Sequence, residues 1–151
     1  MEHYAIKLEA RQVAEPDFPY NKEQLSTPSS VATFCKVLQD SDVEKFITIH
    51  ISSQNIVNCI QVFNGTYIDC SVPIRDIVKG SILSNSPKII LVHNHPSGSL
   101  TFSEEDKNLT KGIVQSLLLF NVDVIDHLLI AGLNYVSMKE HLPEFLIKKW
   151  R

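Results

Sequence analysis

The alternation of apolar and polar positions predicts a chain in which strands and helices are interspersed. Residues 45–52 and 56–63 are rich in β-branched side chains and are separated by a short polar segment, a pattern typical of a hairpin. The nearly continuous apolar run at 88–92 is typical of a buried strand. Further strands are expected at 122–131 and 135–138, and a short one is expected to reach residue 70.

Three segments have the periodicity and the end signals of helices. Thr27 followed by Pro28 is typical of a helix start, and that helix is expected to run to about residue 39. A second helix is expected at 73–83, and a third is expected to begin at Ser103. Its apolar residues recur at helical spacing: Leu109, Ile113, Leu117 and Phe120. Strands interspersed with helices indicate an α/β sandwich.

Length and composition favour a single domain. The 151 residues, 44% of them hydrophobic, suffice for one hydrophobic core but not comfortably for two. Residues 1–27, which contain prolines at positions 16 and 19, are expected to form an arm or short edge strand with a linker. Residues 28–151 would then form the domain.

Cysteine usage and hydropathy bear on the location of the protein. The three cysteines are odd in number and lack the pair spacing of zinc ribbons, which argues against a disulfide framework. No stretch approaches the roughly 18 uninterrupted apolar residues of a membrane span. The N-terminus also lacks the basic and apolar regions of a signal peptide. We therefore expect a cytoplasmic protein that has no membrane partner.

The segment with the clearest chemistry follows the buried strand at 88–92. His93 and His95 have the period-two spacing that points both side chains to the same face of a sheet. Ser103 and Asp106 follow at the start of the third helix, after a turn that contains Pro96 and Gly98. Two imidazoles and a carboxylate are three ligands of the kind that a catalytic zinc ion takes, with a fourth position left to water. The sequence therefore predicts a metal site.

A structural explanation for Ser103 and Asp106 stays open beside this one. Ser-x-x-Asp at the start of an amphipathic helix is similar to a capping box, in which both side chains bind backbone N–H groups and need no metal. Capping and a role in the site can coexist in the same residues.

The segment resembles the JAMM (MPN-type) metalloprotease motif, which is His-x-His, seven residues, Ser, two residues and Asp. HNHPSG at 93–98 is similar to the RadC branch in particular. Three other segments are similar to the same branch: FNGT at 63–66, PIRD at 73–76 and IDHLLI at 125–130. The resemblance covers about residues 30–141, and it implies a three-layer αβα sandwich around a mixed sheet, the cytidine-deaminase-like fold of JAMM/MPN domains.

The resemblance also implies roles for individual residues. His93, His95 and Asp106 would bind one zinc ion (Zn²⁺) per chain, and Ser103 would stabilise a tetrahedral intermediate. An upstream glutamate would act on the zinc-activated water, but lining up FNGT places Gln61 at that position, and a glutamine cannot take a proton. Other carboxylates are candidates for the base: Glu104, Glu105, Asp69, Asp76, Asp123 and Asp126.

A second pair of polar residues, Asp126 and His127, lies in the strand predicted at 122–131. Such a histidine can support a metal ligand through a hydrogen bond, or it can simply satisfy a buried polar group. Because neighbours in a strand face opposite sides, at most one of the two is expected to face the site.

Two functions from different classes follow from these observations. One is a zinc-dependent metallohydrolase that cleaves peptide or isopeptide bonds of a protein substrate. The other, which Gln61 favours, is a non-catalytic metal-binding accessory module linked to DNA repair or mobile-element DNA metabolism. The RadC family is associated with DNA repair by name, but a formal net charge of −3 gives little support for nucleic-acid binding. The basic cluster at 148–151, with Trp150, is more simply explained as a solvated helix end than as a stacking site for a base.

Overall fold

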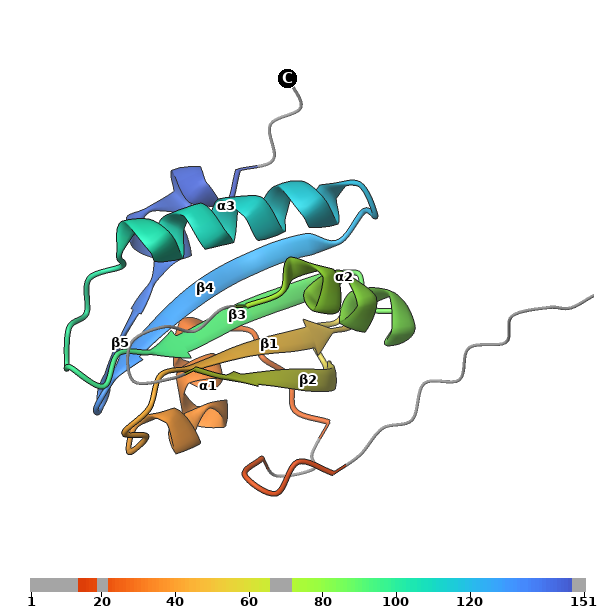
Figure 1. The fold of residues 1–151 in the computed structure, drawn as a ribbon. Coiled ribbons are helices and arrows are strands. Elements are labelled where there is room, and N and C mark those ends of the chain that lie inside the picture. The colour runs from red at the N-terminus through yellow and green to blue at the C-terminus, as the bar shows by residue number, and fades with distance from the viewer. Residues whose placement is uncertain (1–13, 19–21, 66–71, 148–151) are drawn as a thin grey trace, which may run out of the picture.

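A five-stranded mixed sheet with the strand order β2-β1-β3-β4-β5 forms the centre of the molecule (Figure 1). The computed structural model describes residues 14–18, 22–65 and 72–147. The strands are β1 (Lys45–Ile51), β2 (Val57–Asn64), β3 (Lys88–Asn94), β4 (Asp123–Ala131) and β5 (Asn134–Ser137). The pair β3 and β4 is parallel, and the other neighbouring pairs are antiparallel.

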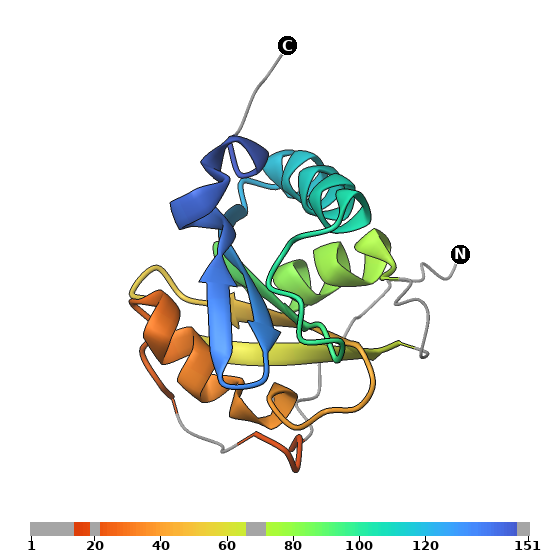
Figure 2. The ribbon, with the colours of Figure 1, turned by 90° about the vertical axis from the view of Figure 1, so that its left-hand side faces the viewer.

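Helices cover both faces of this sheet. They are α1 (Pro28–Phe34), α2 (Ile74–Leu83), α3 (Glu104–Leu118) and the short α4 (Met138–His141), with 3₁₀ turns at η1 (Lys36–Leu38) and η2 (Pro143–Phe145). One core cluster packs α1 against the sheet, and another packs α2 and α3 against the opposite face (Figure 2). The three-layer αβα sandwich around a mixed sheet is therefore confirmed.

Side chains along β3 alternate between these two layers. Ile90 and Val92 lie in the core on the α1 side, whereas Ile89 and Leu91 lie in the core on the side of α2 and α3. Both faces are buried, which explains why this strand is almost entirely apolar. The same alternation continues to the end of the strand, where it separates the side chain of His93 from that of Asn94.

The hairpin of β1 and β2 is confirmed, but two predicted helices end earlier than their patterns indicated. The short strand expected to reach residue 70 lies outside the described residues. The helix predicted to run to residue 39 ends as α1 at Phe34 and continues as a 3₁₀ turn. Phe120 was expected on one helical face with Leu109, Ile113 and Leu117, but it lies beyond α3 and is 49% exposed.

The end of α3 has a local cause. Asn121 takes the left-handed conformation (φ 55°), and Val122 N–H donates to Leu117 O over 3.1 Å. This is the Schellman pattern that ends helices, and asparagine is one of the few residues besides glycine that adopts it readily. Phe120 is thereby turned out of the buried stripe of the helix.

A buried polar cluster ties β1, β2 and α2 together. His50 Nε2 lies 2.8 Å from Gln61 Oε1, and His50 Nδ1 lies 3.2 Å from Ser81 Oγ. Thr48 also donates to Gln61 Oε1, and Gln61 Nε2 donates to Asp76 O over 2.9 Å. Burial lowers the pKa of His50, so the imidazole is held neutral within this cluster.

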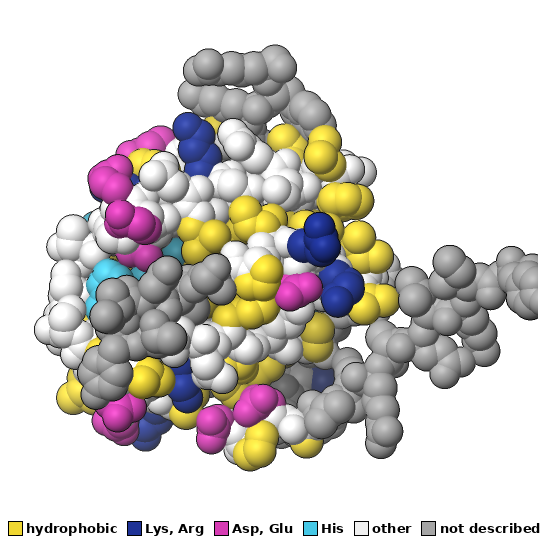
Figure 3. Space-filling view, in the orientation of Figure 1, with side chains coloured by type: hydrophobic (Ala, Val, Ile, Leu, Met, Phe, Trp, Pro, Cys, Tyr) yellow, Lys and Arg dark blue, Asp and Glu magenta, His cyan; other side chains and the backbone are white. Residues whose placement is uncertain are grey.

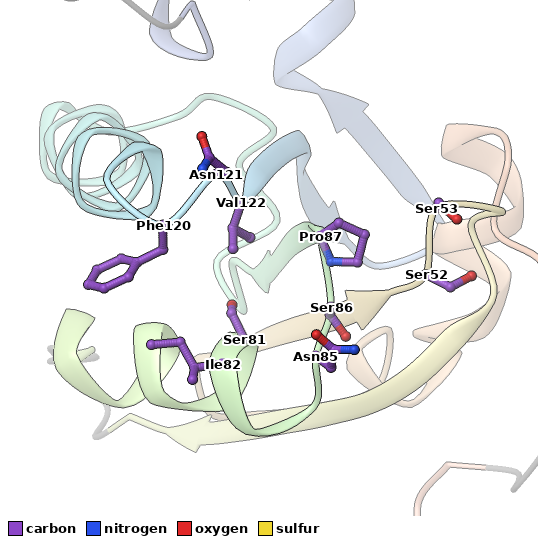
Figure 4. Close-up of a pocket in the computed structure, with 10 residues that line it drawn as sticks. All are labelled: Ser52, Ser53, Ser81, Ile82, Asn85, Ser86, Pro87, Phe120, Asn121 and Val122. Atoms are coloured by element: carbon purple, nitrogen blue, oxygen red, sulfur yellow. The ribbon is translucent and has the colours of Figure 1, made fainter.

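A cavity of about 650 Å³ lies at the opposite end of β3 from His93 (Figure 4). Its wall comes from the turn between β1 and β2, the segment from α2 to β3 and the turn before β4. All ten lining residues are neutral, among them Ser52, Ser86 and Phe120. No acid, base or histidine of the described residues therefore lines it. Among the described residues, no helix is long and apolar enough to cross a membrane.

Replacement of Gly80 by alanine is expected to destabilise the protein. A methyl group there would overlap the side-chain amide of Gln61, which its hydrogen bonds hold in place. Overpacking costs roughly 1–3 kcal/mol, against about 1 kcal/mol that alanine gains over glycine in a helix. Urea unfolding of Gly80→Ala should thus show a net loss of up to about 2 kcal/mol. In a Gln61→Ala background the same change should no longer destabilise, and an equal loss in both backgrounds would disprove the overlap.

Candidate metal centre

Four potential ligands from three separate segments meet at one end of β3. Ligand atoms of Glu44, His93, His95 and Asp106 all lie within 4.8 Å of one another. His93 Nε2 lies 3.2 Å from His95 Nε2 and 3.2 Å from Asp106 Oδ1, and His95 Nε2 lies 3.4 Å from Asp106 Oδ2. On the surface, histidine side chains lie next to a group of acidic ones at this end of the molecule (Figure 3).

The start of α3 delivers Asp106 to this cluster. Ser103 is the N-cap of the helix: its Oγ accepts from Asp106 N–H over 3.1 Å, and Ser103 N–H donates to Asp106 Oδ2 over 2.7 Å. The capping box is thus present, and the same carboxylate also reaches both histidines. Because the Ser103 hydroxyl oxygen acts only as an acceptor among the described residues, its own proton is left for a further acceptor.

A chain of buried hydrogen bonds fixes the tautomer of His93. Thr110 Oγ1 donates to Asp106 O over 2.7 Å, so it accepts from His127 Nδ1 over 2.6 Å. Burial holds the pKa of His127 well below its usual value, so this imidazole is neutral and its Nε2 accepts from His93 Nδ1 over 2.8 Å. The lone pair of His93 Nε2 must then point into the cluster.

His95 is oriented in the same way by the loop that follows it. His95 N–H donates to Ile130 O over 2.9 Å, and His95 Nδ1 lies 3.1 Å from Ser99 O, a carbonyl that can only accept. His95 Nδ1 therefore carries a proton, and in the neutral imidazole the Nε2 lone pair points at the cluster. Two nitrogen lone pairs and a carboxylate thus converge on one point.

The electrostatics of the cluster favour positive charge at that point. Hydrogen bonding to Asp106 raises the pKa of His95, and burial only partly opposes this. Burial would raise the pKa of Asp106, but its contacts with His93 and His95 outweigh this and hold the pKa of the carboxyl far below its usual range. Either a proton or a metal cation supplies the charge.

The donor geometry fits a metal ion. Ligand atoms about 2.0–2.2 Å from a tetrahedral ion lie about 3.3–3.6 Å from one another. The observed separations of 3.2, 3.2 and 3.4 Å among His93, His95 and Asp106 come close to this. This buried group of histidines and an aspartate can therefore bind a metal.

Glu44 is the member of the cluster that sequence reasoning missed. It was not among the candidate bases, because it looks like the polar residue that precedes an ordinary strand. The antiparallel pairing of Phe46 with His93 places the start of β1 beside the end of β3. The signal that could have found it is a carboxylate directly before the strand that becomes the neighbour of β3.

Gln61, by contrast, is not brought to this cluster. It lies on β2, two strands away from β3 and thus about 9–10 Å across the sheet, and its amide binds Thr48, His50 and the backbone of Asp76. Gln61 is therefore not among the atoms that converge at the end of β3, whereas Glu44 is, and the alignment of Gln61 with the family's upstream glutamate stays a prediction. Of the carboxylates considered as replacements, Asp69 lies outside the described residues and the others do not join the group: Glu104, Glu105, Asp76, Asp123 and Asp126.

Asp126 and His127 face opposite sides, as neighbours in a strand must. His127 contacts His93, whereas Asp126 accepts hydrogen bonds from Ser137 Oγ (2.6 Å) and Lys139 N–H (2.9 Å) and so anchors the chain beyond β4. Phe102 is 4% exposed and packs against the rings of His93 and His127. The hydrogen-bonded histidines are thereby shielded from water on one side.

The fold and the cluster together define a class of protein. It is an αβα domain with a candidate metal site, in which His-x-His lies at a strand end and an aspartate at the start of the next helix. The family model described as the RadC-like JAB domain matches residues 25–143, and the chain belongs to that family. This confirms the resemblance in the sequence.

Related proteins described as UPF0758 proteins match over most of this chain. The relative from Thiobacillus denitrificans is 36% identical over 120 residues, which cover 78% of this chain and 54% of the relative. One from Chloroflexus aurantiacus is 36% identical over 133 residues, 87% of this chain and 56% of the relative. One from Methanosarcina mazei is 32% identical over 121 residues, which cover 79% of this chain and 53% of the relative. The chain thus spans about half the length of these relatives.

Protein purified without added metal is expected to hold close to one zinc ion per chain. His95→Ala and Asp106→Ala should lose it, since each removes one of three converging ligands. Elemental mass spectrometry measures the stoichiometry, and Glu105→Ala, on the exposed first turn of α3, is the control. Zinc retained in both ligand variants would contradict the assignment.

Thr110→Val should weaken zinc binding by roughly 10–100-fold, because it removes the acceptor that fixes the tautomer of His127 and, through it, that of His93. Competition with a chromophoric chelator measures the affinity. Thr33→Val is a matched control, since Thr33 also donates to the carbonyl four residues earlier but lies exposed on α1. Equal affinities of the two variants would exclude the hydrogen-bond chain.

Proposed function

We propose that this protein is a zinc-dependent hydrolase of amide bonds, either peptide or isopeptide. The observation that carries the proposal is the position of the Glu44 carboxylate within 4.8 Å of the ligand atoms of His93, His95 and Asp106. Three ligands and a separate carboxylate are what metal-assisted hydrolysis requires. The non-catalytic alternative depended on Gln61, and Glu44 removes that reason for it.

His93, His95 and Asp106 would hold the ion. A zinc ion bound there supplies Lewis acidity, which lowers the pKa of water and polarises a carbonyl. The hydrogen bonds from Thr110 through His127, and from Ser99, keep both imidazoles in the tautomer that this role needs.

Glu44 has the position and the chemistry of a general base. Its carboxylate is only partly buried, so water and a substrate can reach it. In the proposed reaction it takes a proton from the attacking water and returns it to the amine that leaves. Neither ligand histidine can do this, because each Nδ1 proton is engaged with a fixed acceptor.

In the proposed reaction Ser103 stabilises the negative charge that develops on the carbonyl oxygen. Its hydroxyl accepts from the backbone of α3, and the proton it retains can be donated to that oxygen. One such donor is typically worth about 2.7–4 kcal/mol of transition-state stabilisation.

The test is a Glu44→Gln variant assayed against a quenched-fluorescent peptide library and a peptide with an ε-linked lysine isopeptide bond. Loss of the base should lower kcat/KM by about 10²–10⁴-fold while zinc stays bound. Gln61→Leu, which alters a glutamine outside the cluster, is the control and should keep its activity if it folds. Full turnover by Glu44→Gln would exclude Glu44 as the base, and a zinc-loaded parent that cleaves no library member would refute amide hydrolysis.

A further inference from the structure

Asn94, the residue between the two histidines, lies on the opposite side of β3 from them. The alternation of the strand turns its side chain toward the α1 layer, and it is 2% exposed. There it meets residues 41–45, the segment that leads into β1.

The carboxamide of Asn94 binds the backbone on both sides of Glu44. Asn94 Oδ1 accepts from Lys45 N–H over 2.7 Å, and Asn94 Nδ2 donates to Val43 O over 3.0 Å. The Ser41 hydroxyl donates to the same Val43 carbonyl over 2.8 Å. Both chain neighbours of Glu44 are therefore attached to the residue that separates His93 from His95.

These bonds extend the pairing of β1 with β3 past its last backbone pair. The register of the two strands ends at Phe46 opposite His93, and the Asn94 side chain continues it by one residue toward Glu44. The role needs a donor and an acceptor on one short, planar group, which asparagine has. Aspartate keeps the acceptor but loses the donor, and serine is too short to bridge the two bonds.

We propose that Asn94 is a positioning residue that sets the place of the Glu44 carboxylate relative to His93, His95 and Asp106. This inference rests on the proposed function, in which Glu44 is the base. Asn94 touches neither the ligand atoms nor a substrate, so it acts only through the backbone of residues 43–45. A second anchor on Glu44 itself, Gly65 N–H to Glu44 O over 2.9 Å, leaves the carboxylate side chain free to face the cluster.

A merely structural role for Asn94 would reduce stability and nothing else. A positioning role also changes how the cluster responds to pH, because the Glu44 carboxylate shifts relative to the three ligands. Cobalt(II) is a suitable probe of the pH response, because its visible absorption depends on its ligands and on the ionisation of groups beside it. The experiment is a pH titration of the absorption of the full-length chain loaded with Co²⁺, with metal affinity and thermal unfolding measured on the same samples.

The variants are Glu44→Gln as reference, Asn94→Ser and Asn94→Asp as tests, and Asn108→Ser, an exposed asparagine of α3, as control. Both Asn94 variants should move the midpoint of the titration in the direction seen for Glu44→Gln. Their Co²⁺ affinity should change by less than about threefold, well short of the roughly 10–100-fold typical when support of a ligand is lost. In a Glu44→Gln background, Asn94→Ser should add no further shift. Asn94→Asp is nearly isosteric and keeps one bond, so it serves if Asn94→Ser does not fold.

The outcomes separate this inference from the function on which it rests. A parent that binds no Co²⁺, or whose titration is unaffected by Glu44→Gln, overturns the proposed function. A parent that responds to Glu44→Gln while Asn94→Asp keeps the parental midpoint overturns only the positioning role. A shift that persists in full in the Glu44→Gln background also overturns it, because the effect would then not pass through Glu44.

Discussion

The antiparallel pairing of β1 with β3 is the constraint on which the candidate site depends. It sets Phe46 opposite His93 and so brings the residues before β1 to the end of β3. A slip of one residue would turn the side chains of β1 to the opposite layer. That slip would take Ile47, Ile49 and Ile51 out of the α1-side core and turn Thr48 and His50 into it, so the packing of both layers holds the register. The chemistry of the cluster is thus secured by the packing of residues that take no part in it.

At the end of β3, the side chains on its two faces make different contacts. On the side of α2 and α3, His93 is enclosed by Phe102, His127 and the start of α3. On the other side, Asn94 joins the backbone that carries Glu44. One strand thus presents His93 to one layer and binds the backbone around Glu44 from the other. His50, which is also buried, is held by Gln61 and Ser81, away from the cluster.

Helix capping and a place in the candidate metal cluster are compatible in Asp106, because its Oδ2 takes part in both. The carboxylate accepts from the N-cap backbone and still presents oxygens to both histidines. The capping box fixes the rotamer of Asp106 before any ion is present, which lowers the entropy cost of assembling the site. The capping box at the start of α3 thus forms part of the candidate metal cluster.

The sequence by itself determined the local elements and the spacing of the motif. Short-range patterns set three local elements: the β-branched hairpin, the apolar strand that ends at His93 and the helix start at Ser103. The spacing of the motif also singled out His93, His95 and Asp106 as candidate ligands. It did not find Glu44 in the cluster or the hydrogen bonds of Asn94 to the backbone on both sides of Glu44. Those depend on which strands become neighbours and in what register, and the pairing of β1 with β3 joins Phe46 to His93, 47 positions apart in the sequence. Only the packed sheet decides such long-range contacts, because no local pattern records the partner of a strand.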